Sequence, residues 1–249
     1  MREDGFETAW VARGDDVAWE HAKPLGGLLN PRDGVVNPAD LMALLASKHR
    51  GRIREHQEVC EIEAGAGGVR MRTAERVFEA ERVVVCTNAY TGTLFPSLAS
   101  CVTPRRGQML AVHAPGVRLE HAYYANRGSE YFRNATADTI VVGGCRTYHA
   151  DAEVGIEDRT TPIVQADLER FAERVLGKRY PIVARWAGTM GFSPDGLPLV
   201  GAIPGVAGGF FCGGFTGHGM SMARRSARSV VELMLDGTPT PLPLERAMR

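Results

Sequence analysis

A glycine-rich segment close to the end of the chain does most to limit how this sequence can fold. The apolar residues Phe210–Cys212 predict a short strand, and glycines then recur at positions 213, 214, 217 and 219. The sequence after them predicts a helix, whose free N–H groups and positive dipole end face these glycines. Glycines let the backbone approach a flat or anionic ligand without side-chain obstruction. The segment therefore indicates either a cofactor cradle or a tight turn kept for packing.

The composition narrows the class of protein. The chain has 249 residues, of which 44% are hydrophobic and 23% are charged, enough to bury a core as one large domain or two smaller ones. Lys+Arg and Asp+Glu both number 29, so no net charge attracts nucleic acid or an anionic membrane. No apolar stretch approaches the ~20 residues of a membrane span, and the start of the chain lacks the pattern of a signal peptide. We therefore expect a cytoplasmic protein with no nucleic-acid partner and no membrane span.

The five cysteines predict neither a disulfide framework nor a metal site. They are scattered, odd in number and never spaced as CxxC. We therefore expect reduced thiols, as in a cytoplasm, and no metal ion. They are Cys60, Cys86, Cys101, Cys145 and Cys212.

Three helices are predicted from their end signals and from the spacing of apolar residues. The first begins after Asn37 as N-cap, with a proline at its first position, and Gly51 lies past its end. Leu41, Leu44 and Leu45 give this helix an apolar stripe. The other two helices are expected over Pro162–Leu176 and from Met220 to Gly237.

Strand patterns fall into two groups. The run Val83–Cys86 is rich in β-branched residues without alternation, which fits a strand buried on both faces of a parallel sheet and indicates α/β architecture. From Thr103 to Val142, short segments with aromatic residues and turns indicate an antiparallel sheet. The other predicted strands are Glu58–Ile62, Val69–Thr73, Val77–Ala80, Arg106–Val112, Ala122–Asn126, Glu130–Arg133, Thr139–Val142, Ile182–Trp186, Leu199–Ile203 and Phe210–Cys212.

Several segments together carry a family resemblance because of the order in which they occur. They are Gly26-Gly27, Asp33–Pro38, Glu58-Val59, Val83–Tyr90, Pro104–Gln108, Trp186–Gly188, Ser193–Gly201 and Gly213–Met220. In this order the chain resembles the carboxy-terminal part of the FAD-dependent D-amino-acid oxidase and glycine oxidase superfamily. That superfamily includes sarcosine oxidases and γ-glutamylputrescine oxidoreductases. The resemblance extends from about Leu25 over nearly all of the remaining chain.

The amino-terminal nucleotide-binding signature of that superfamily is missing. No GxGxxG occurs in the sequence, and Gly65–Gly68 has the wrong spacing and falls in a predicted hairpin turn. The chain begins where the resemblance places the end of the nucleotide-binding half. Three interpretations stay open: a fragment, one subunit of a split enzyme whose partner chain supplies the amino-terminal half, or a remnant without activity.

The resemblance implies an α/β fold in two parts. One part is a partial FAD-binding, Rossmann-like domain, and the other is an antiparallel-sheet domain that binds the substrate. The implied FAD-facing pieces are 34–100 and 186–236, the substrate-binding pieces are 1–33 and 101–185, and 237–249 form a carboxy-terminal tail.

The resemblance also implies the chemistry and the cofactor. A carbon–nitrogen bond of an amine or amino acid would be oxidised by hydride transfer to the flavin of FAD. Covalent members attach flavin through a cysteine near Trp186–Pro194, and this chain has no cysteine between Cys145 and Cys212, so we expect noncovalent FAD. The implied cofactor-binding residues are Val59, Thr87, Asn88, Gly188, Gly214, Gly217, His218, Gly219 and Met220.

Each of these residues also has a structural interpretation. His218 fits a helix-cap or packing residue as well as a neighbour of the flavin ring. Val59 fits an ordinary strand residue, and Thr87 and Asn88 fit caps of a short helix expected over Ala89–Leu94.

The implied catalytic residues are His218, Arg106 and Tyr131. Arg105 or Arg106 is placed to meet a substrate carboxylate, although at least one of the pair is expected to be solvated. Tyr131 and Arg133 alternate on a strand and would share the face of the sheet that covers the active site, or belong to the core and rim.

A second departure from the family pattern bears on the substrate. Sarcosine-type oxidases carry a lysine after the Gly-His-Gly stretch that helps to hold the substrate carboxylate, and Ser221 stands at the matching position here. An amine is therefore favoured over a simple α-amino acid, as in the γ-glutamylputrescine oxidoreductases. The alternative from another class is a noncatalytic interaction subunit whose glycine-rich turns serve packing.

Overall fold

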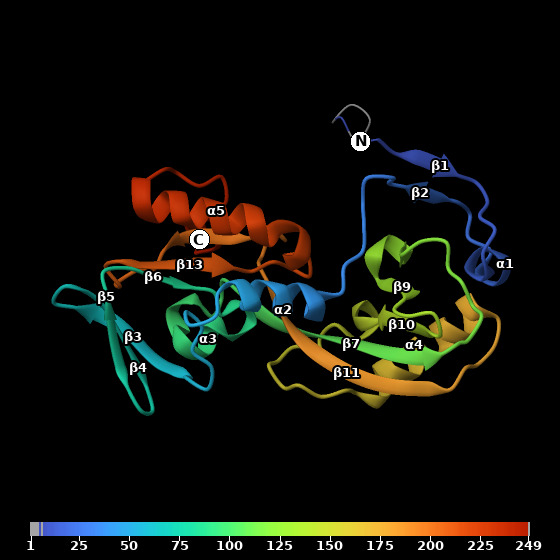
Figure 1. Cartoon of the computed structure of the whole chain (residues 1–249), viewed down its shortest axis with the longest axis horizontal. Helices are drawn as coiled ribbons and strands as arrows, with labels where there is room; N and C mark the ends of the chain where they lie inside the picture. The colour runs from blue at the N-terminus through green and yellow to red at the C-terminus, as the bar shows by residue number, and fades with distance from the viewer. Residues whose placement is uncertain (1–4, 6, 249) are drawn as a thin grey trace. The chain divides into compact units, whose positions relative to one another are not determined.

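A computed structural model describes residues 5 and 7–248 of the chain (Figure 1). These residues form two compact units. Unit 1 comprises the described residues up to Ile53 together with Gly107–Ala150 and Arg159–Ala187, and unit 2 comprises Arg54–Arg106, Asp151–Asp158 and the described residues from Gly188 onward. Each unit is therefore assembled from segments that lie far apart in the sequence.

Unit 1 is built on most of a five-stranded sheet in the order β11-β7-β10-β9-β8. Its strands are β7 (Thr103–His113), β8 (Tyr123–Ala125), β9 (Glu130–Asn134), β10 (Thr139–Gly144) and β11 (Ile182–Phe192). β9 and β10 pair antiparallel, as do β7 and β10. Both β7 and β11 continue into segments of unit 2. The antiparallel sheet expected between residues 103 and 142 is thus confirmed.

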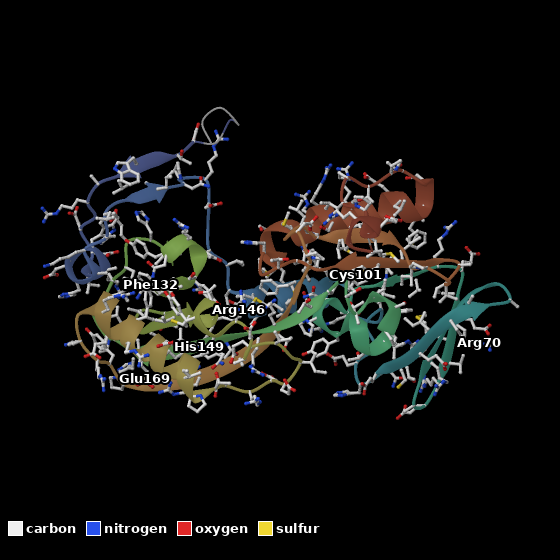
Figure 2. All side chains as sticks on the ribbon, turned by 180° about the vertical axis from the view of Figure 1, so that it is seen from behind. Arg70, Cys101, Phe132, Arg146, His149 and Glu169 are labelled. Carbon is white, nitrogen blue, oxygen red and sulfur yellow. The ribbon has the colours of Figure 1, made fainter. Side chains whose placement is uncertain are left out.

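The core of unit 1 lies between this sheet and α4 (Pro162–Leu176). Leu168, Phe171 and Val175 recur at helical spacing and pack against buried sheet residues that include Phe132. Phe132, which is labelled in Figure 2, belongs to this core, where it stacks on Tyr123 and meets Phe171 edge-on. The helix ends at Gly177, which adopts the left-handed conformation that favours glycine.

The remaining elements of unit 1 precede this sheet in the sequence. Asn37 caps α2 (Pro38–Lys48) as expected, because its side chain accepts a hydrogen bond from the backbone N–H of Ala39. None of the α2 residues is buried, so the apolar stripe of this helix is exposed. The elements are β1 (Ala9–Val11), α1 (Val17–Ala22), β2 (Gly27–Leu29) and α2 (Pro38–Lys48).

Unit 2 contains two three-stranded sheets and a long helix. One sheet has the order β12-β13-β6, and the other is the meander β3-β4-β5. Helix α5 (Gly219–Asp236) packs on β12 and β13 (Figure 1). The strands are β3 (Val59–Gly65), β4 (Gly68–Thr73), β5 (Val77–Ala80), β6 (Val83–Val85), β12 (Leu199–Ala202) and β13 (Gly209–Gly213).

Strand β6 differs from its prediction in burial. It is a parallel neighbour of β13 as expected, but it lies at the edge of its sheet, and only Val85 of this strand is buried. An edge strand has one neighbour instead of two, which leaves Val83 and Val84 partly exposed. The helix expected over Ala89–Leu94 forms as a 3-10 turn at Asn88–Tyr90 followed by α3 (Thr91–Leu94).

Short 3-10 helices occur in both units, and the remaining ones are Pro96–Leu98, Asn126–Gly128, Arg146–His149 and Leu244–Ala247. No helix in the described part of the chain has the length and apolar character needed to cross a membrane. Residues 5 and 7–248 also contain no group of three or more His, Cys, Asp or Glu side chains arranged to hold a metal ion.

Candidate functional site

The first element of the candidate site is the turn that follows β6. Asn88 adopts a left-handed backbone conformation with φ 45°. Its side-chain Oδ1 accepts a hydrogen bond of 2.9 Å from the backbone N–H of Gly214. Thr87 lies beside it with its hydroxyl 3.1 Å from that of Thr91, and it makes no side-chain cap to the 3-10 turn. Asn88 therefore joins the β6 turn to the glycine-rich turn instead of capping its own helix.

The glycine-rich turn after β13 is held in place by the end of β11. The N–H of Thr216 donates to the carbonyl of Gly191 at 2.8 Å, and the hydroxyl of Thr216 accepts from the N–H of Ser193 at 3.2 Å. A Cβ on Gly191 would lie 2.5 Å from Asn88 Oδ1, so this close approach requires glycine. Three segments distant in sequence therefore converge around Asn88.

The turn leads into the N-terminus of α5, which is open. His218 is the N-cap residue, and its side chain makes no capping hydrogen bond. Gly217 has φ 84°, and a Cβ there would meet only the Met190 sulfur, at 3.7 Å. Gly217, His218 and Met220 are exposed, and Gly219 is half-buried. The first N–H groups of this 18-residue helix and its positive dipole end therefore face a glycine-rich, exposed turn.

Two further cofactor candidates lie in unit 2 outside this hydrogen-bonded group. Val59 is half-buried at the start of β3, beside an irregularity in its pairing with β4. Gly188 lies on β11, and a Cβ there would meet no atom within 4 Å, so packing within the described chain does not require this glycine. All the cofactor-binding residues expected from the sequence thus belong to unit 2.

Thr189, next to Gly188, is a candidate that sequence reasoning missed. Its hydroxyl oxygen is buried and has no hydrogen-bond partner among the described residues. An unpaired buried hydroxyl costs about 1–3 kcal/mol, which a ligand that binds it would remove. A threonine on a strand is too common to give a sequence signal for such a role.

Arg106 is fully engaged by the protein itself. Its side chain is 1% exposed and its Nε lies 2.9 Å from Oε2 of Glu153, which is 0% exposed. The same guanidinium donates to the carbonyl of Ala152 at 3.0 Å and reaches Glu157 at 3.4 Å. This pairing favours a structural role for Arg106 over the contact with a substrate carboxylate that the sequence suggested. Its neighbour Arg105 is half-buried, with its guanidinium 5.8 Å from the centre of the Phe192 ring.

Tyr131, the third catalytic candidate, lies on β9 in unit 1. Its ring is 5.7 Å from that of Tyr124 and lies over Gly143, where a Cβ would be 2.4 Å from the ring. Burial raises the pKa of the Tyr131 hydroxyl above its ordinary value, so the phenol stays neutral and can donate a hydrogen bond. His218 and Arg106 belong to unit 2.

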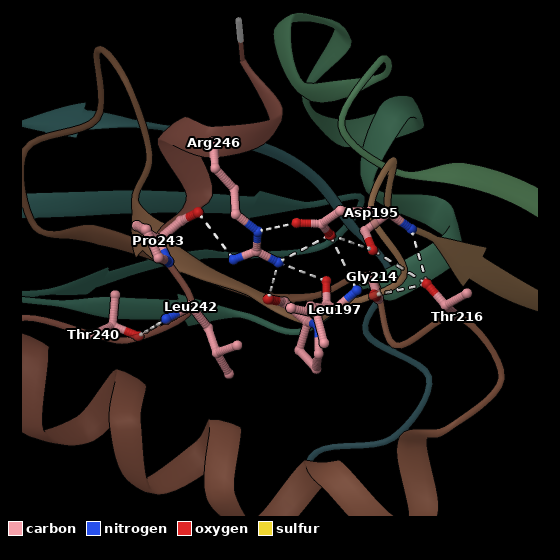
Figure 3. Close-up of polar contacts among 10 residues, drawn as sticks. Asp195, Leu197, Gly214, Thr216, Thr240, Leu242, Pro243 and Arg246 are labelled. Atoms are coloured by element: carbon pink, nitrogen blue, oxygen red, sulfur yellow. Dashed lines mark hydrogen bonds and ion pairs between the residues drawn. The ribbon is translucent and has the colours of Figure 1, made fainter.

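The carboxy-terminal segment supports the candidate site through Arg246, a role that the sequence did not reveal. The Arg246 guanidinium pairs with Asp195 and donates to the carbonyls of Leu197 and Pro198, at 2.8 and 2.6 Å. Figure 3 shows Arg246 beside Asp195 and Leu197. The hydroxyl of Ser193, two residues before Asp195, lies 3.2 Å from that of Thr216. Arg246 therefore anchors the segment that holds the glycine-rich turn.

Replacing Arg246 with alanine is expected to destabilise the fold by about 1–3 kcal/mol, because charge-assisted hydrogen bonds to Asp195 and to two backbone carbonyls are lost. Urea unfolding followed by circular dichroism measures this change. Arg228→Ala is the matched control, since Arg228 pairs with Glu232 one helical turn away and is largely exposed. That control should lose only about 0.3–0.5 kcal/mol, and equal losses in both variants would contradict the anchor.

The Arg246 contact also predicts a pH dependence. The hydrogen bond from Arg246 lowers the pKa of Asp195. A carboxyl group with a lowered folded-state pKa stabilises the fold above its unfolded pKa of about 3.9, and this contribution is lost as the pH falls through the folded value. The stability gap between the wild type and Arg246→Ala should therefore narrow below about pH 4.

The comparisons with known proteins define the class to which these features belong. The sequence model of the DAO family, described as FAD dependent oxidoreductase, matches residues 1–233. The chain belongs to this family of FAD-dependent oxidoreductases.

The chain is also similar to individual oxidoreductases. The chain is 27% identical over 242 residues to a glycine oxidase from Geobacillus kaustophilus, a match that covers 92% of the chain and 62% of that protein. It is 25% identical over 242 residues to a probable oxidoreductase, OrdL, from Rhizobium meliloti, which covers 90% of the chain and 52% of that protein. The chain therefore spans between about half and two thirds of the length of these relatives.

A solved structure shows the same fold. The crystal structure of glycine oxidase from Geobacillus kaustophilus superposes with a TM-score of 0.79 and 22% identity, over 99% of this chain and 67% of that one. The mixed α/β architecture with antiparallel sheets, expected from the sequence, is thereby confirmed.

The residues of unit 2 fit a flavin. Reduced flavin carries negative charge near N1 and O2, and an uncapped helix N-terminus stabilises such charge. The open N-terminus of α5, the exposed glycine at position 217 and the unpaired hydroxyl of Thr189 all suit a flat, polar ligand.

Proposed function

We propose that the chain provides the flavin-facing and substrate-binding parts of an FAD-dependent oxidoreductase that oxidises the C–N bond of an amine or amino acid. The observation that carries this proposal is the open N-terminus of α5, whose preceding turn is fixed by Asn88 and by the end of β11. Val59, Thr87, Asn88, Gly188, Gly214 and Gly217–Met220 would hold FAD noncovalently. FAD, when bound, supplies the acceptor for the substrate hydride.

The protein residues have positioning and electrostatic roles in this proposal. The N–H groups at the start of α5 would stabilise negative charge beside His218. The neutral phenol of Tyr131 would donate a hydrogen bond to the substrate. Ser221 carries no positive charge that could bind a substrate carboxylate, and its hydroxyl donates a hydrogen bond to the carbonyl of His218 at 2.9 Å. An amine substrate is favoured for this reason.

The proposal includes a further polypeptide segment, in a longer form of this chain or in a partner chain, that supplies the amino-terminal half of the FAD site. Exposed apolar side chains on α2 support it: Met42, Leu44 and Leu45 are 51%, 52% and 43% exposed. Large exposed apolar surface marks a site where another part of a protein packs. The exposed residues are equally consistent with the alternative, a noncatalytic interaction subunit.

Flavin binding tests the proposal directly. The purified chain is mixed with excess FAD, the unbound cofactor is removed, and the visible absorbance spectrum is recorded. Retained flavin absorbance is the expected result and would justify a screen of amines for bleaching of the flavin band. A colourless chain that is indifferent to FAD would contradict flavin binding by this chain without the further segment.

A glycine substitution makes the test specific to the turn before α5. We expect Gly217→Ala to reduce retained flavin on the order of tenfold or more, because it adds a side chain at the open turn and strains a left-handed backbone position. Gly116→Ala is the matched control, since Gly116 has a similar φ of 77° and no atom within 4 Å of an added Cβ. Equal flavin retention by the two variants would contradict the assignment of the turn before α5 to flavin binding.

A further inference from the structure

Two cysteines lie next to each other at the ends of neighbouring strands in unit 2. β6 and β13 run parallel (Figure 1), and the last pair of their register is Val85 opposite Phe211. The next residues are Cys86, directly after the end of β6, and Cys212 on β13. Neighbouring strands are about 4.8 Å apart, and the Cα atoms of a disulfide are usually about 4.4–6.8 Å apart. The strand register therefore places these two cysteines within the span of a disulfide.

The two thiols also lie on the same face of the sheet. Side chains alternate along a strand, so Cys86 shares a face with Val84. Val84 packs against the apolar cluster that contains Cys212 and Val230 of α5. Each of the two thiols shifts the pKa of the other, as expected for side chains that lie close together. Their sulfur atoms therefore face one another.

The two thiols differ in exposure and in the direction in which their pKa values are shifted. Cys86 is exposed, whereas Cys212 is 4% exposed. The contact with Cys212 lowers the pKa of the Cys86 thiol to about 7, and the same contact raises the pKa of Cys212. Because thiolates are the reactive form, Cys86 is the attacking thiol and Cys212 is placed to resolve the product.

We propose that Cys86 and Cys212 form a peroxide-sensitive dithiol that closes to a reversible disulfide. The Cys86 thiolate attacks one oxygen of hydrogen peroxide, an S–O bond forms, the O–O bond breaks and hydroxide leaves. The sulfur of Cys212 then attacks the sulfenic sulfur, so that the S–S bond forms and the S–O bond breaks. The departing hydroxide combines with the Cys212 proton as water. Two electrons pass from the sulfurs to the peroxide, which is reduced to one hydroxide and one water.

The position of this dithiol gives the disulfide a structural consequence. Asn88 follows Cys86 by two residues and Gly214 follows Cys212 by two, and the side chain of Asn88 bonds the N–H of Gly214. Oxidation would therefore link covalently two strand ends that a hydrogen bond already joins. The dithiol chemistry requires no flavin, so its test is independent of the proposed enzymatic function.

The test exposes the reduced full chain to hydrogen peroxide, blocks the remaining thiols by alkylation and maps the digested peptides by mass spectrometry. The expected product joins the peptides that contain Cys86 and Cys212, and dithiothreitol reverses it. Cys60 is exposed on β3 and serves as the internal reference in the same sample. Cys86 should be oxidised on the order of tenfold faster than Cys60, because the contact with Cys212 lowers the pKa of the Cys86 thiol and so raises the share of reactive thiolate.

Two variants separate the steps. In Cys212→Ser the sulfenic acid of Cys86 should persist and react with dimedone, whereas Cys60→Ser should form the disulfide at the wild-type rate. Oxidation of Cys86 no faster than Cys60, or sulfinic acid at Cys86 with Cys212 still alkylated, would overturn the proposal. The comparison of Cys86 with Cys60 needs only the wild-type chain, so it decides the matter even where a variant fails to fold.

Discussion

Replacing Glu153 with alanine is expected to destabilise the protein by about 3–5 kcal/mol. Glu153 is 0% exposed and pairs with Arg106, which is 1% exposed. Without the carboxylate, the guanidinium charge stays buried with only carbonyl oxygens and the more distant Glu157 around it. Urea unfolding monitored by circular dichroism measures the loss, which is a large share of the stability of an ordinary domain.

Two variants distinguish the burial of charge from the loss of any ion pair. Glu157 reaches the same guanidinium at 3.4 Å, but its side chain is 60% exposed, so Glu157→Ala should cost less than about 1 kcal/mol. The double variant Arg106→Met with Glu153→Leu removes both charges and should recover most of the loss. Similar losses in Glu153→Ala and Glu157→Ala would contradict this account. If the double variant is stable but loses turnover of an amine, the substrate role suggested for Arg106 gains support.

Local signals in the sequence were sufficient to predict most of the elements. The Asn37 cap and its following proline predicted α2, and the apolar spacing up to Gly177 predicted α4 with the same bounds, Pro162–Leu176. The strands from β3 to β6 and from β7 to β10 also lie where alternation and turn residues placed them, within a few residues. These features depend on neighbours in the sequence, which is why a single sequence contains them.

The contacts that assemble the candidate site could not be predicted in this way. Asn88 bonds a residue 126 positions away, and Arg246 pairs with a residue 51 positions away. The sequence could not show that Arg106 would meet a buried glutamate, because Glu153 lies in a segment without a strand or helix pattern. The sequence also could not show which apolar residues would be buried. The leucines of α2 have the spacing of a helix face that packs on a core, but they are not buried.

Replacing Asn88 with alanine is the substitution expected to damage the candidate flavin site most. It removes the acceptor for the buried N–H of Gly214, which costs about 1–3 kcal/mol. It also places alanine in a left-handed conformation with φ 45°, which adds about 1 kcal/mol. We expect a total loss of about 2–4 kcal/mol in urea unfolding. The turn before α5 would lose its link to β6, so flavin retained after removal of excess FAD should fall on the order of tenfold.

Asn88→Gly and Asn88→Asp separate the two causes. Glycine accepts the left-handed backbone but has no side-chain acceptor, so it should lose only the hydrogen-bond part of the stability and still retain little flavin. Aspartate tolerates the same backbone and keeps a carboxylate oxygen for the N–H of Gly214, so it should stay closest to the wild type. Unchanged flavin retention in Asn88→Gly would show that the Asn88–Gly214 hydrogen bond does not position the turn. Loss of flavin in both Asn88→Gly and Asn88→Ala, with retention in Asn88→Asp, would show that the acceptor oxygen orders the backbone from Gly214 to the first N–H groups of α5.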